Sequence, residues 1–290
     1  GNSRAITTEP AAYYGVRFSP DGRRLTYSKG DANQDVWIRA LDRGTETRLT
    51  PESSEEFDPV WSPDGRRIAY SSERRAEDPR VFVRAADGSG DESFLWKGSD
   101  AVMPQSWAPD GRAVALAVLG EGKQWDIWIL DPGKAAARPF LATPHEEVQP
   151  DFSPDGRWIA YVSDESGRYE VYARAHPGRG PKIQVSADGG MEPVWSRDGK
   201  ELFFRDGDRL MTASVRPGPD LSFAKPSVVF EKPGFLSLPF TEFRQYDVAP
   251  DGKSFVMIQL PAANTPPAVP VVVTNWFAEV GRKLEEAERR

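Results

Sequence analysis

Few side chains in this sequence could carry catalysis. The 290 residues include no cysteine and two histidines, His145 and His176, and no Gly-x-Ser-x-Gly segment marks a serine nucleophile. A histidine-based metal site or a Ser-His-Asp triad needs companion residues that these two histidines do not have. The sequence therefore predicts a protein that is not an enzyme, with no catalytic residue, no metal ligand and no cofactor.

One short spacing is typical of calcium chemistry. Residues 31–35 read Asp-x-Asn-x-Asp, but the glycine and the glutamate that complete a calcium loop are missing, and Asp42 stands where the glutamate belongs. A polar loop before a strand explains the same residues, and we do not predict a calcium site there.

A motif that occurs six times predicts the strands and turns that would position a functional site. Its copies are FSPDGRRLTY (18–27), WSPDGRRIAY (61–70), WAPDGRAVAL (107–116), FSPDGRWIAY (152–161), WSRDGKELFF (195–204) and VAPDGKSFVM (248–257). The motif aspartates are 43, 46, 45, 43 and 53 residues apart. A period near 40–45 residues with strand patterning is typical of a propeller blade, a four-stranded sheet. The Ser-Pro-Asp-Gly step suits a tight turn between the first two strands, and the aspartates are expected to serve that turn.

The repeat predicts an all-β fold, a six-bladed β-propeller of four-stranded antiparallel blades, over residues 1–275. The sixth blade has its first strand at about 243–249, its second at 254–260 and its third at about 269–274, but no fourth strand follows. Residues 4–8 resemble the outer strand of the first blade, so they are expected to complete the last blade and close the ring. Residues 276–290 place Trp276, Phe277, Val280 and Leu284 on one helical stripe, which predicts a short amphipathic helix and tail.

The net charge and the hydropathy of the sequence exclude some classes of binding partner. The net charge is −7 and the pI about 5.1, which argues against nucleic-acid binding through a basic surface. No stretch approaches eighteen apolar residues, and the first ten residues do not have the pattern of a signal peptide. We expect a monomer that does not itself insert into a membrane.

The repeat resembles the TolB-type, WD-like propeller repeat of bacteria. The resemblance is carried by the Ser-Pro-Asp-Gly step and the Pro-x-aromatic segments before it, as in DPVWSPDG (58–65) and QPDFSPDG (149–156), and covers essentially the whole chain. The segment PVVVTNWFAEVGRKL (270–284) is similar to the ends of propellers in bacterial membrane serine/threonine kinases. The resemblance implies a non-catalytic scaffold that binds a protein or peptide outside the cytoplasm, as a sensor or interaction domain. The alternatives are a catalytic propeller such as a metal-assisted lyase or lactonase, a propeller domain of a hydrolase, and a structural spacer.

The candidate partner site lies where the inner strands of a propeller begin. The loops entering those strands place many carboxylates at one mouth of the central channel, among them Glu55, Glu56, Asp58, Glu146, Glu147, Glu192 and Glu242. The longest connection, residues 232–246, adds Phe240 and Phe243. Aromatic anchors within an acidic rim predict a docking site for a basic partner. Two alternatives remain open: the aromatic residues plug the channel, and the carboxylates are ordinary solvated loop residues.

Overall fold

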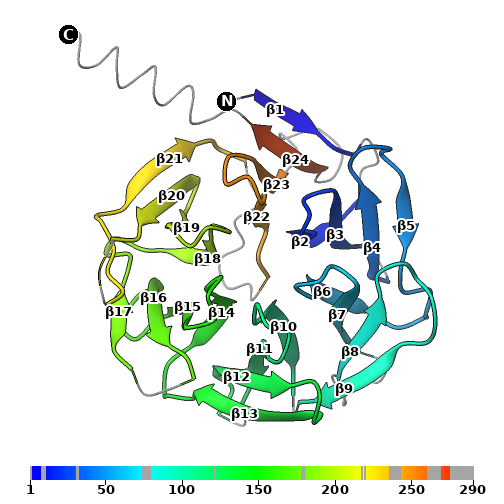
Figure 1. Ribbon diagram of the computed structural model, residues 1–290, viewed down its shortest axis with the longest axis horizontal. Coiled ribbons are helices and arrows are strands. Elements are labelled where there is room, and N and C mark those ends of the chain that lie inside the picture. Colours follow the sequence, from blue (N-terminus) through cyan, green and yellow to red (C-terminus); the bar gives the residue numbers. More distant parts are fainter. Residues whose placement is uncertain are drawn as a thin grey trace.

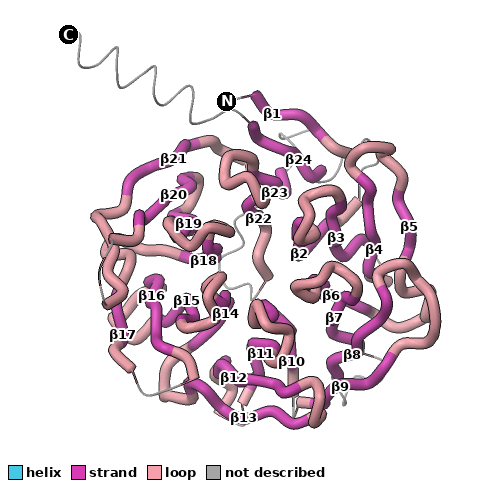
Figure 2. The backbone as a smooth tube through the Cα atoms, viewed as in Figure 1, coloured by secondary structure: helices cyan, strands magenta, loops and turns pink. Residues whose placement is uncertain are grey.

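The computed structural model describes residues 2–7, 11–30, 33–73, 80–98, 100–120, 122–177, 180–216, 218, 220–234, 243–259 and 269–274. Within them the chain forms six four-stranded antiparallel sheets around a central axis (Figure 1). These residues contain strands, turns and loops but no helix (Figure 2). The predicted all-β, six-bladed propeller is confirmed.

The blades are named one to six in chain order, and the strands of each run from the axis outward. Blade one is β2 (Tyr13–Phe18), β3 (Arg24–Lys29), β4 (Asp35–Ala40) and β5 (Glu46–Arg48); blade two is β6 (Glu56–Trp61), β7 (Arg67–Ser72), β8 (Arg80–Ala85) and β9 (Ser93–Lys97). Blade three is β10 (Val102–Trp107), β11 (Val114–Leu119), β12 (Trp125–Asp131) and β13 (Ala136–Leu141); blade four is β14 (Glu147–Phe152), β15 (Trp158–Ser163), β16 (Glu170–Ala175) and β17 (Lys182–Gln184). Blade five is β18 (Met191–Trp195), β19 (Glu201–Asp206), β20 (Arg209–Ser214) and β21 (Ser227–Glu231); blade six is β22 (Tyr246–Val248), β23 (Phe255–Gln259), β24 (Val269–Thr274) and β1 (Asn2–Ala5).

The ring is closed by the N-terminal strand, as predicted. β1 pairs antiparallel with β24, from Asn2 opposite Thr274 to Ala5 opposite Val271, and the N-terminus lies beside β24 (Figure 1). The backbone N–H of Ile6 donates to the carbonyl of Pro270 at 3.0 Å. The strand covers residues 2–5, slightly earlier than the predicted 4–8. The predicted C-terminal helix lies outside the described residues.

The repeated turn explains why six similar hairpins form. In blade one the hydroxyl of Ser19 donates to Oδ1 of Asp21 at 2.6 Å, and the backbone N–H of Arg23 donates to the same oxygen at 3.0 Å. Gly22 adopts a φ of 70°, which closes the turn. These hydrogen bonds, the Ser19 bond foremost, lower the pKa of Asp21. The same serine–aspartate contact occurs in blades two, four and five, so these motif aspartates hold the turn.

The core lies between neighbouring blades, because each sheet packs both faces against another sheet. Ile68, Ala69 and Tyr70 are consecutive in β7 and all fully buried. The hydroxyl of Tyr70 donates to Glu92 at 2.6 Å, and in blade one that of Tyr27 donates to Glu46 at the same distance. Tyr27 and Tyr70 thus satisfy their hydroxyl groups within their own blades.

Candidate functional site

The predicted acidic mouth is mostly inside the protein. Glu56, at the start of β6, is fully buried and accepts hydrogen bonds from the hydroxyls of Ser54 and of Ser72, the latter at 3.0 Å. Glu147, at the start of β14, is buried and accepts from both the hydroxyl and the backbone N–H of Thr143. Burial raises the pKa of both carboxyl groups. The expectation that Glu56 and Glu147 form an exposed contact surface is therefore corrected: they fasten loops to the inner strands.

Asp58 and Glu192 are also buried, for a reason that recurs between blades. Both have a positive φ, 52° and 57°, as does Gln149 at 55°, and each lies at a register shift between the two innermost strands of its blade. Such a bulge redirects a side chain, and here it points across the blade boundary. Gln149 accepts from the backbone N–H of Glu192, and Glu192 accepts from that of Gln245, each at 2.7 Å. Asp58 and Glu192 are therefore corrected from partner contacts to buried groups of the inner ring.

The other residues of the predicted partner site differ in their exposure. Glu55 is exposed, and Glu146 is half-buried with its carboxylate accepting from the backbone N–H of Trp125 at 2.9 Å. Phe240 and Glu242 lie outside the described residues. Phe243 is half-buried, with its ring centroid 5.9 Å from that of Tyr14 and 6.2 Å from that of Phe57. Phe243 therefore packs against the inner strands of blades one and two.

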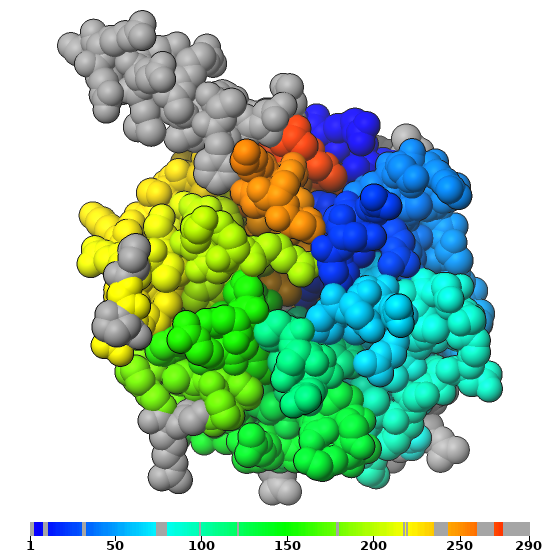
Figure 3. Space-filling view, viewed as in Figure 1, coloured from blue at the N-terminus to red at the C-terminus, as the bar shows by residue number. Residues whose placement is uncertain are grey.

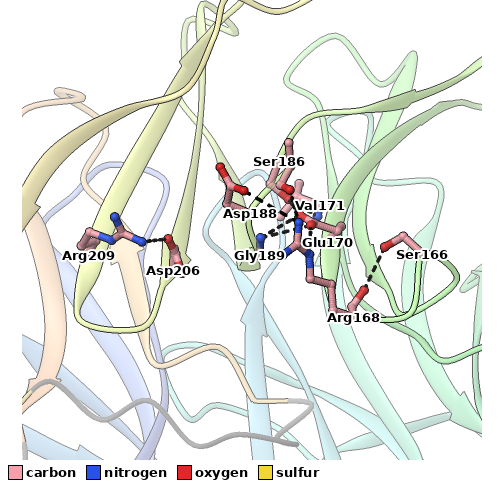
Figure 4. Close-up of polar contacts among 10 residues, drawn as sticks. Ser166, Arg168, Glu170, Val171, Ser186, Asp188, Gly189, Asp206 and Arg209 are labelled. Atoms are coloured by element: carbon pink, nitrogen blue, oxygen red, sulfur yellow. Dashed lines mark hydrogen bonds and ion pairs between the residues drawn. The ribbon is translucent and has the colours of Figure 1, made fainter.

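Glu170 shows the same internal use of a carboxylate at the outer part of this end (Figure 4). It is buried and accepts from the hydroxyl of Ser186, from the backbone N–H of Gly189 at 3.1 Å, and from Nε of Arg168 at 2.7 Å. The hydroxyl of Ser186 in turn accepts from the backbone N–H of Val171 at 2.7 Å. Acidic residues at this end are thus largely engaged in holding strands and loops together.

A cavity of about 390 Å³ opens at the opposite end of the inner strands, on the face of the Ser-Pro-Asp-Gly turns. We call it the central funnel; Figure 3 shows the centre of the disk hollowed. It is lined by Arg17, Phe18, Pro20, Val60, Trp61, Pro63, Gln105, Ser106, Trp107, Pro109, Asp151, Phe152, Ser153, Pro154, Val194, Trp195, Arg197, Arg244, Asp247 and Val248. Aromatic residues and prolines thus surround a smaller set of charged and amide groups.

The funnel contains a buried charge network. Arg244 donates from Nη1 to Oδ1 of Asp151 at 3.0 Å and to the carbonyl of Pro193 at 3.3 Å. Arg17 donates from Nη1 to the carbonyls of Val16 and Arg244, each at 2.9 Å. Burial, followed by the charge of Arg244, lowers the pKa of Arg17 to about 10, so its guanidinium stays protonated at neutral pH. Burial raises the pKa of Asp247, opposed by the two arginines.

Three polar side chains of the funnel join neighbouring blades. Oδ2 of Asp247 accepts from the backbone N–H of Phe18 at 2.8 Å, across the junction of blades six and one. Oδ2 of Asp151 accepts from that of Trp195 at 3.0 Å, and Oγ of Ser106 from that of Phe152 at 3.1 Å. We call these contacts the inter-blade latches. Each latch residue directly precedes the first residue of its motif copy, a position whose side chains reach the next blade.

The sequence analysis missed the funnel, although signals for it were present. The first residue of each motif copy occupies its wall, as Phe18, Trp61, Trp107, Phe152, Trp195 and Val248. In the second position after it, five copies have proline, and blade five has Arg197. Arg197 is thus a cation in the one motif copy that does not have the turn proline, so the turn itself does not require it.

Neither histidine lines the funnel. His145 is exposed, with Nδ1 3.6 Å from Oδ1 of Asp164. His176 is half-buried, packs edge-on against Phe152, and has Nδ1 3.3 Å from the carbonyl of Gly156. In the part of the chain that the structure describes, no group of three or more histidine, aspartate or glutamate residues could hold a metal ion. That part also has no helix long and apolar enough to cross a membrane.

Sequence comparisons find relatives for part of the chain. The family model described as TolB beta propeller domain matches residues 99–217. An uncharacterized peptidase of Bacillus subtilis, YuxL, is 26% identical over 204 residues, which are 54% of this chain and 31% of the relative. The uncharacterized protein Atu1656 of Agrobacterium fabrum is 30% identical over 99 residues, 34% of this chain and 33% of the relative. The chain thus spans about a third of the length of these two curated relatives.

Solved structures share the architecture. TolB from Acinetobacter baumannii superposes with a TM-score of 0.64 at 15% identity, covering 92% of this chain and 64% of that one. An oligogalacturonate lyase in complex with manganese gives 0.64 at 16% identity, covering 93% and 78%. A gluconolactonase of Xanthomonas campestris gives 0.63 at 13% identity, covering 94% and 89%. These likenesses concern the fold. The chain is a six-bladed β-propeller, and its residues 99–217 match the TolB beta propeller family model.

Proposed function

We propose that this propeller is a non-catalytic scaffold that binds a segment of a protein partner in the central funnel. The observation that carries the proposal is the open cavity of about 390 Å³ walled by tryptophans, phenylalanines and turn prolines. Its volume lies in the range of ligand sites, and buried tryptophan is the side chain most often found at the centre of protein-binding surfaces. The wall is rigid because its aromatic residues end the inner strands.

The acidic groups of the funnel support a binding role over catalysis. A general acid or base must exchange a proton with a substrate, so its oxygen atoms must be accessible. Asp151 binds Arg244 through one oxygen and the Trp195 backbone through the other, and Asp247 holds the Phe18 backbone. Both carboxylates are thereby committed to holding blades together.

The proposed site differs from the one predicted from the sequence. The predicted basic partner depended on exposed carboxylates at the mouth where the inner strands begin, and four of these are buried. The funnel at the other end combines apolar walls with an accessible opening, so we place the partner there.

We further propose that the protein acts outside the cytoplasm as an interaction or sensor domain. The TolB-type repeat supports this assignment, together with the similarity of the C-terminal segment to kinase-linked propellers. A reporter fusion at each end, combined with cell fractionation, tests it. Activity of the fusion only in the cytoplasmic fraction would contradict it.

A displayed library of random heptapeptides, selected on the purified protein, tests the binding proposal. Pro109→Trp fills the rim of the funnel, and Glu55→Trp is the matched control at the opposite mouth. Both positions are exposed. We expect the selected peptides to lose binding to P109W and to keep it for E55W. The reverse pattern would place the site at the other mouth. Turnover of an oligogalacturonate or of gluconolactone by protein supplied with manganese would contradict a non-catalytic scaffold.

A further inference from the structure

The wall and floor of the funnel hold hydrogen-bond donors that have no acceptor. They are Nε and Nη2 of Arg17, Nε2 of Gln105, and the indole Nε1 of Trp61, Trp107 and Trp195. Arg17 is 4% exposed, Gln105 2% and each tryptophan 7%. The indole N–H groups of Trp37 and Trp128, outside the funnel, are unpaired as well. The funnel differs in adding the guanidinium of Arg17 and the amide of Gln105, and buried donors of this kind are rarely left unpaired in native proteins, which indicates a place for an acceptor-rich group.

The same lining lacks a corresponding set of free acceptors. Among the described residues that line the funnel, every buried side-chain nitrogen or oxygen without a partner is a donor. The carboxylates of Asp151 and Asp247 are engaged in the charge network and the inter-blade latches. The unpaired polar side-chain atoms of the funnel lining are therefore hydrogen-bond donors, which would be satisfied by a ligand that offers acceptors.

Arg197 gives the opening a positive charge. It stands where the other five motif copies have Pro20, Pro63, Pro109, Pro154 and Pro250. Its side chain is exposed and lines the funnel, and it forms no ion pair with the described residues. Arg17 and Arg244 are balanced by the buried carboxylates of Asp58, Asp151 and Asp247, so Arg197 is the cation that adds positive charge at the opening. A free guanidinium suits an anion with planar oxygen pairs, a carboxylate above all.

A second cavity extends the funnel outward between blades four and five. We call it the side groove; its volume is about 330 Å³, and it shares Ser153, Pro154 and Trp195 with the funnel. Its outer part is lined by Val215, Arg216, Asp220 and Leu221, from the connection between β20 and β21. Asp155, Arg157 and Asp198 also line the groove, so its charged residues are of both signs and its apolar surface comes from Val215 and Leu221. That connection covers residues 215–226, whereas blade one joins its outer strands through residues 41–45. Arg197 and this long connection are two departures from the repeat in the same blade, and they flank one continuous path.

We propose that the ligand is an extended peptide segment that places a carboxylate in the funnel and continues through the side groove. This rests on the proposed function and names its ligand class. Arg197 supplies the charge at the rim, the unpaired donors of Gln105, Arg17 and the tryptophans supply hydrogen bonds, and Trp195, Val215 and Leu221 supply apolar contact along the groove. The assignment reverses the partner charge expected from the sequence: the ligand is acidic where it is bound.

A positional-scanning heptapeptide library in two forms, free acid and C-terminal amide, tests the proposal. The wild-type protein should prefer carboxylates. A preference confined to the free-acid form identifies a terminal carboxylate, and enrichment of Asp and Glu in both forms identifies a side-chain carboxylate. Arg197→Pro restores the residue of the other blades and is expected to fold. It should weaken carboxylate peptides about tenfold while leaving their amide or Asn/Gln analogues unchanged. Arg112→Ala, an exposed arginine on the same face outside the funnel, is the matched control and should have no effect.

A separate variant tests the side groove. The results also distinguish a failure of the carboxylate assignment from a failure of the proposed function. Leu221→Ala should weaken a selected heptapeptide and leave its carboxylate-bearing tripeptide unchanged. If peptides bind in a P109W-sensitive way but show no carboxylate preference and no response to R197P, the proposed function stands and the carboxylate assignment is overturned. If no peptide binding depends on the funnel, both proposals are overturned.

Discussion

At the scale of single residues, the inter-blade latches show how a few buried polar atoms hold a symmetric fold together. Asp247 is the latch at the ring closure, where blade six meets blade one. It accepts a backbone hydrogen bond and also compensates the charges of Arg17 and Arg244. Removing such a group leaves the buried N–H of Phe18 without its acceptor and takes one carboxylate away from the surroundings of Arg17 and Arg244.

We predict that Asp247→Ala lowers the free energy of unfolding by about 3 kcal/mol, because the loss of one partner from a buried charge network is strongly destabilising. Asp247→Asn should cost less, since its amide oxygen still accepts from Phe18. Urea titration of the two variants and the wild type measures this. Equal effects of both variants would show that the carbonyl-type acceptor is irrelevant at this position.

The buried glutamates give a prediction for pH. The pKa values of Glu56 and Glu147 are raised above their ordinary 4.5 by burial. The folded state therefore binds protons more tightly there than the unfolded state, so these groups lower stability as pH rises from about 4.5 through the raised values. Glu56→Gln should make the decrease in stability over this pH range less steep. Thermal unfolding at closely spaced pH values checks it, and a variant with the same slope as the wild type would contradict the assignment.

At the scale of elements, the closing strand β1 has the largest effect on the ring. It contributes only residues 2–5 but covers the outer edge of β24 and joins the chain ends. An uncovered strand edge exposes unpaired backbone groups and invites association with other chains.

Deletion of residues 1–7 should lower the thermal midpoint by several degrees and promote aggregation, because the ring opens at blade six. Removing Gly1 alone is the control. Light scattering and scanning calorimetry measure both effects. An unchanged midpoint for the longer deletion would mean that β1 adds nothing to closure.

At the scale of the whole molecule, the net charge of the chain and the charge at the opening of the funnel differ in sign. The chain as a whole is acidic, whereas Arg197 places an exposed cation at the opening. An acidic peptide is therefore repelled at long range and attracted only within the opening. The Debye length shortens from about 30 Å at 0.01 M salt to about 8 Å at 0.15 M, so moderate salt screens the long-range field first.

The association rate of a carboxylate peptide should therefore rise between low and physiological salt, in contrast to the fall that accompanies favourable steering. Stopped-flow fluorescence of the funnel tryptophans follows it. An amidated, uncharged peptide is the control and should show no trend. A steep decrease for the acidic peptide would show that the approach to the funnel is already attractive.

Most of the architecture could be predicted from the sequence because it depends on local chemistry. The spacing of the Ser-Pro-Asp-Gly turns sets the six hairpins, and the turn aspartates bind serines and backbone groups only a few residues away. The closure by the N-terminal strand followed from counting strands in the last blade. Each of these inferences uses residues close in sequence or the arithmetic of the repeat.

The site depended on the tertiary structure, because the environment of a polar side chain is decided by neighbours far along the chain. Glu55 and Glu56 are adjacent and equally acidic in the sequence, yet one is exposed and the other is fully buried beside Ser72. Glu192 became an inner-ring acceptor through Gln245, a residue of the next blade. The funnel likewise exists only when the ends of all six inner strands meet at one axis. The sequence alone determined that a propeller forms; the packing of distant blades decided which of its polar side chains are buried and where the funnel lies.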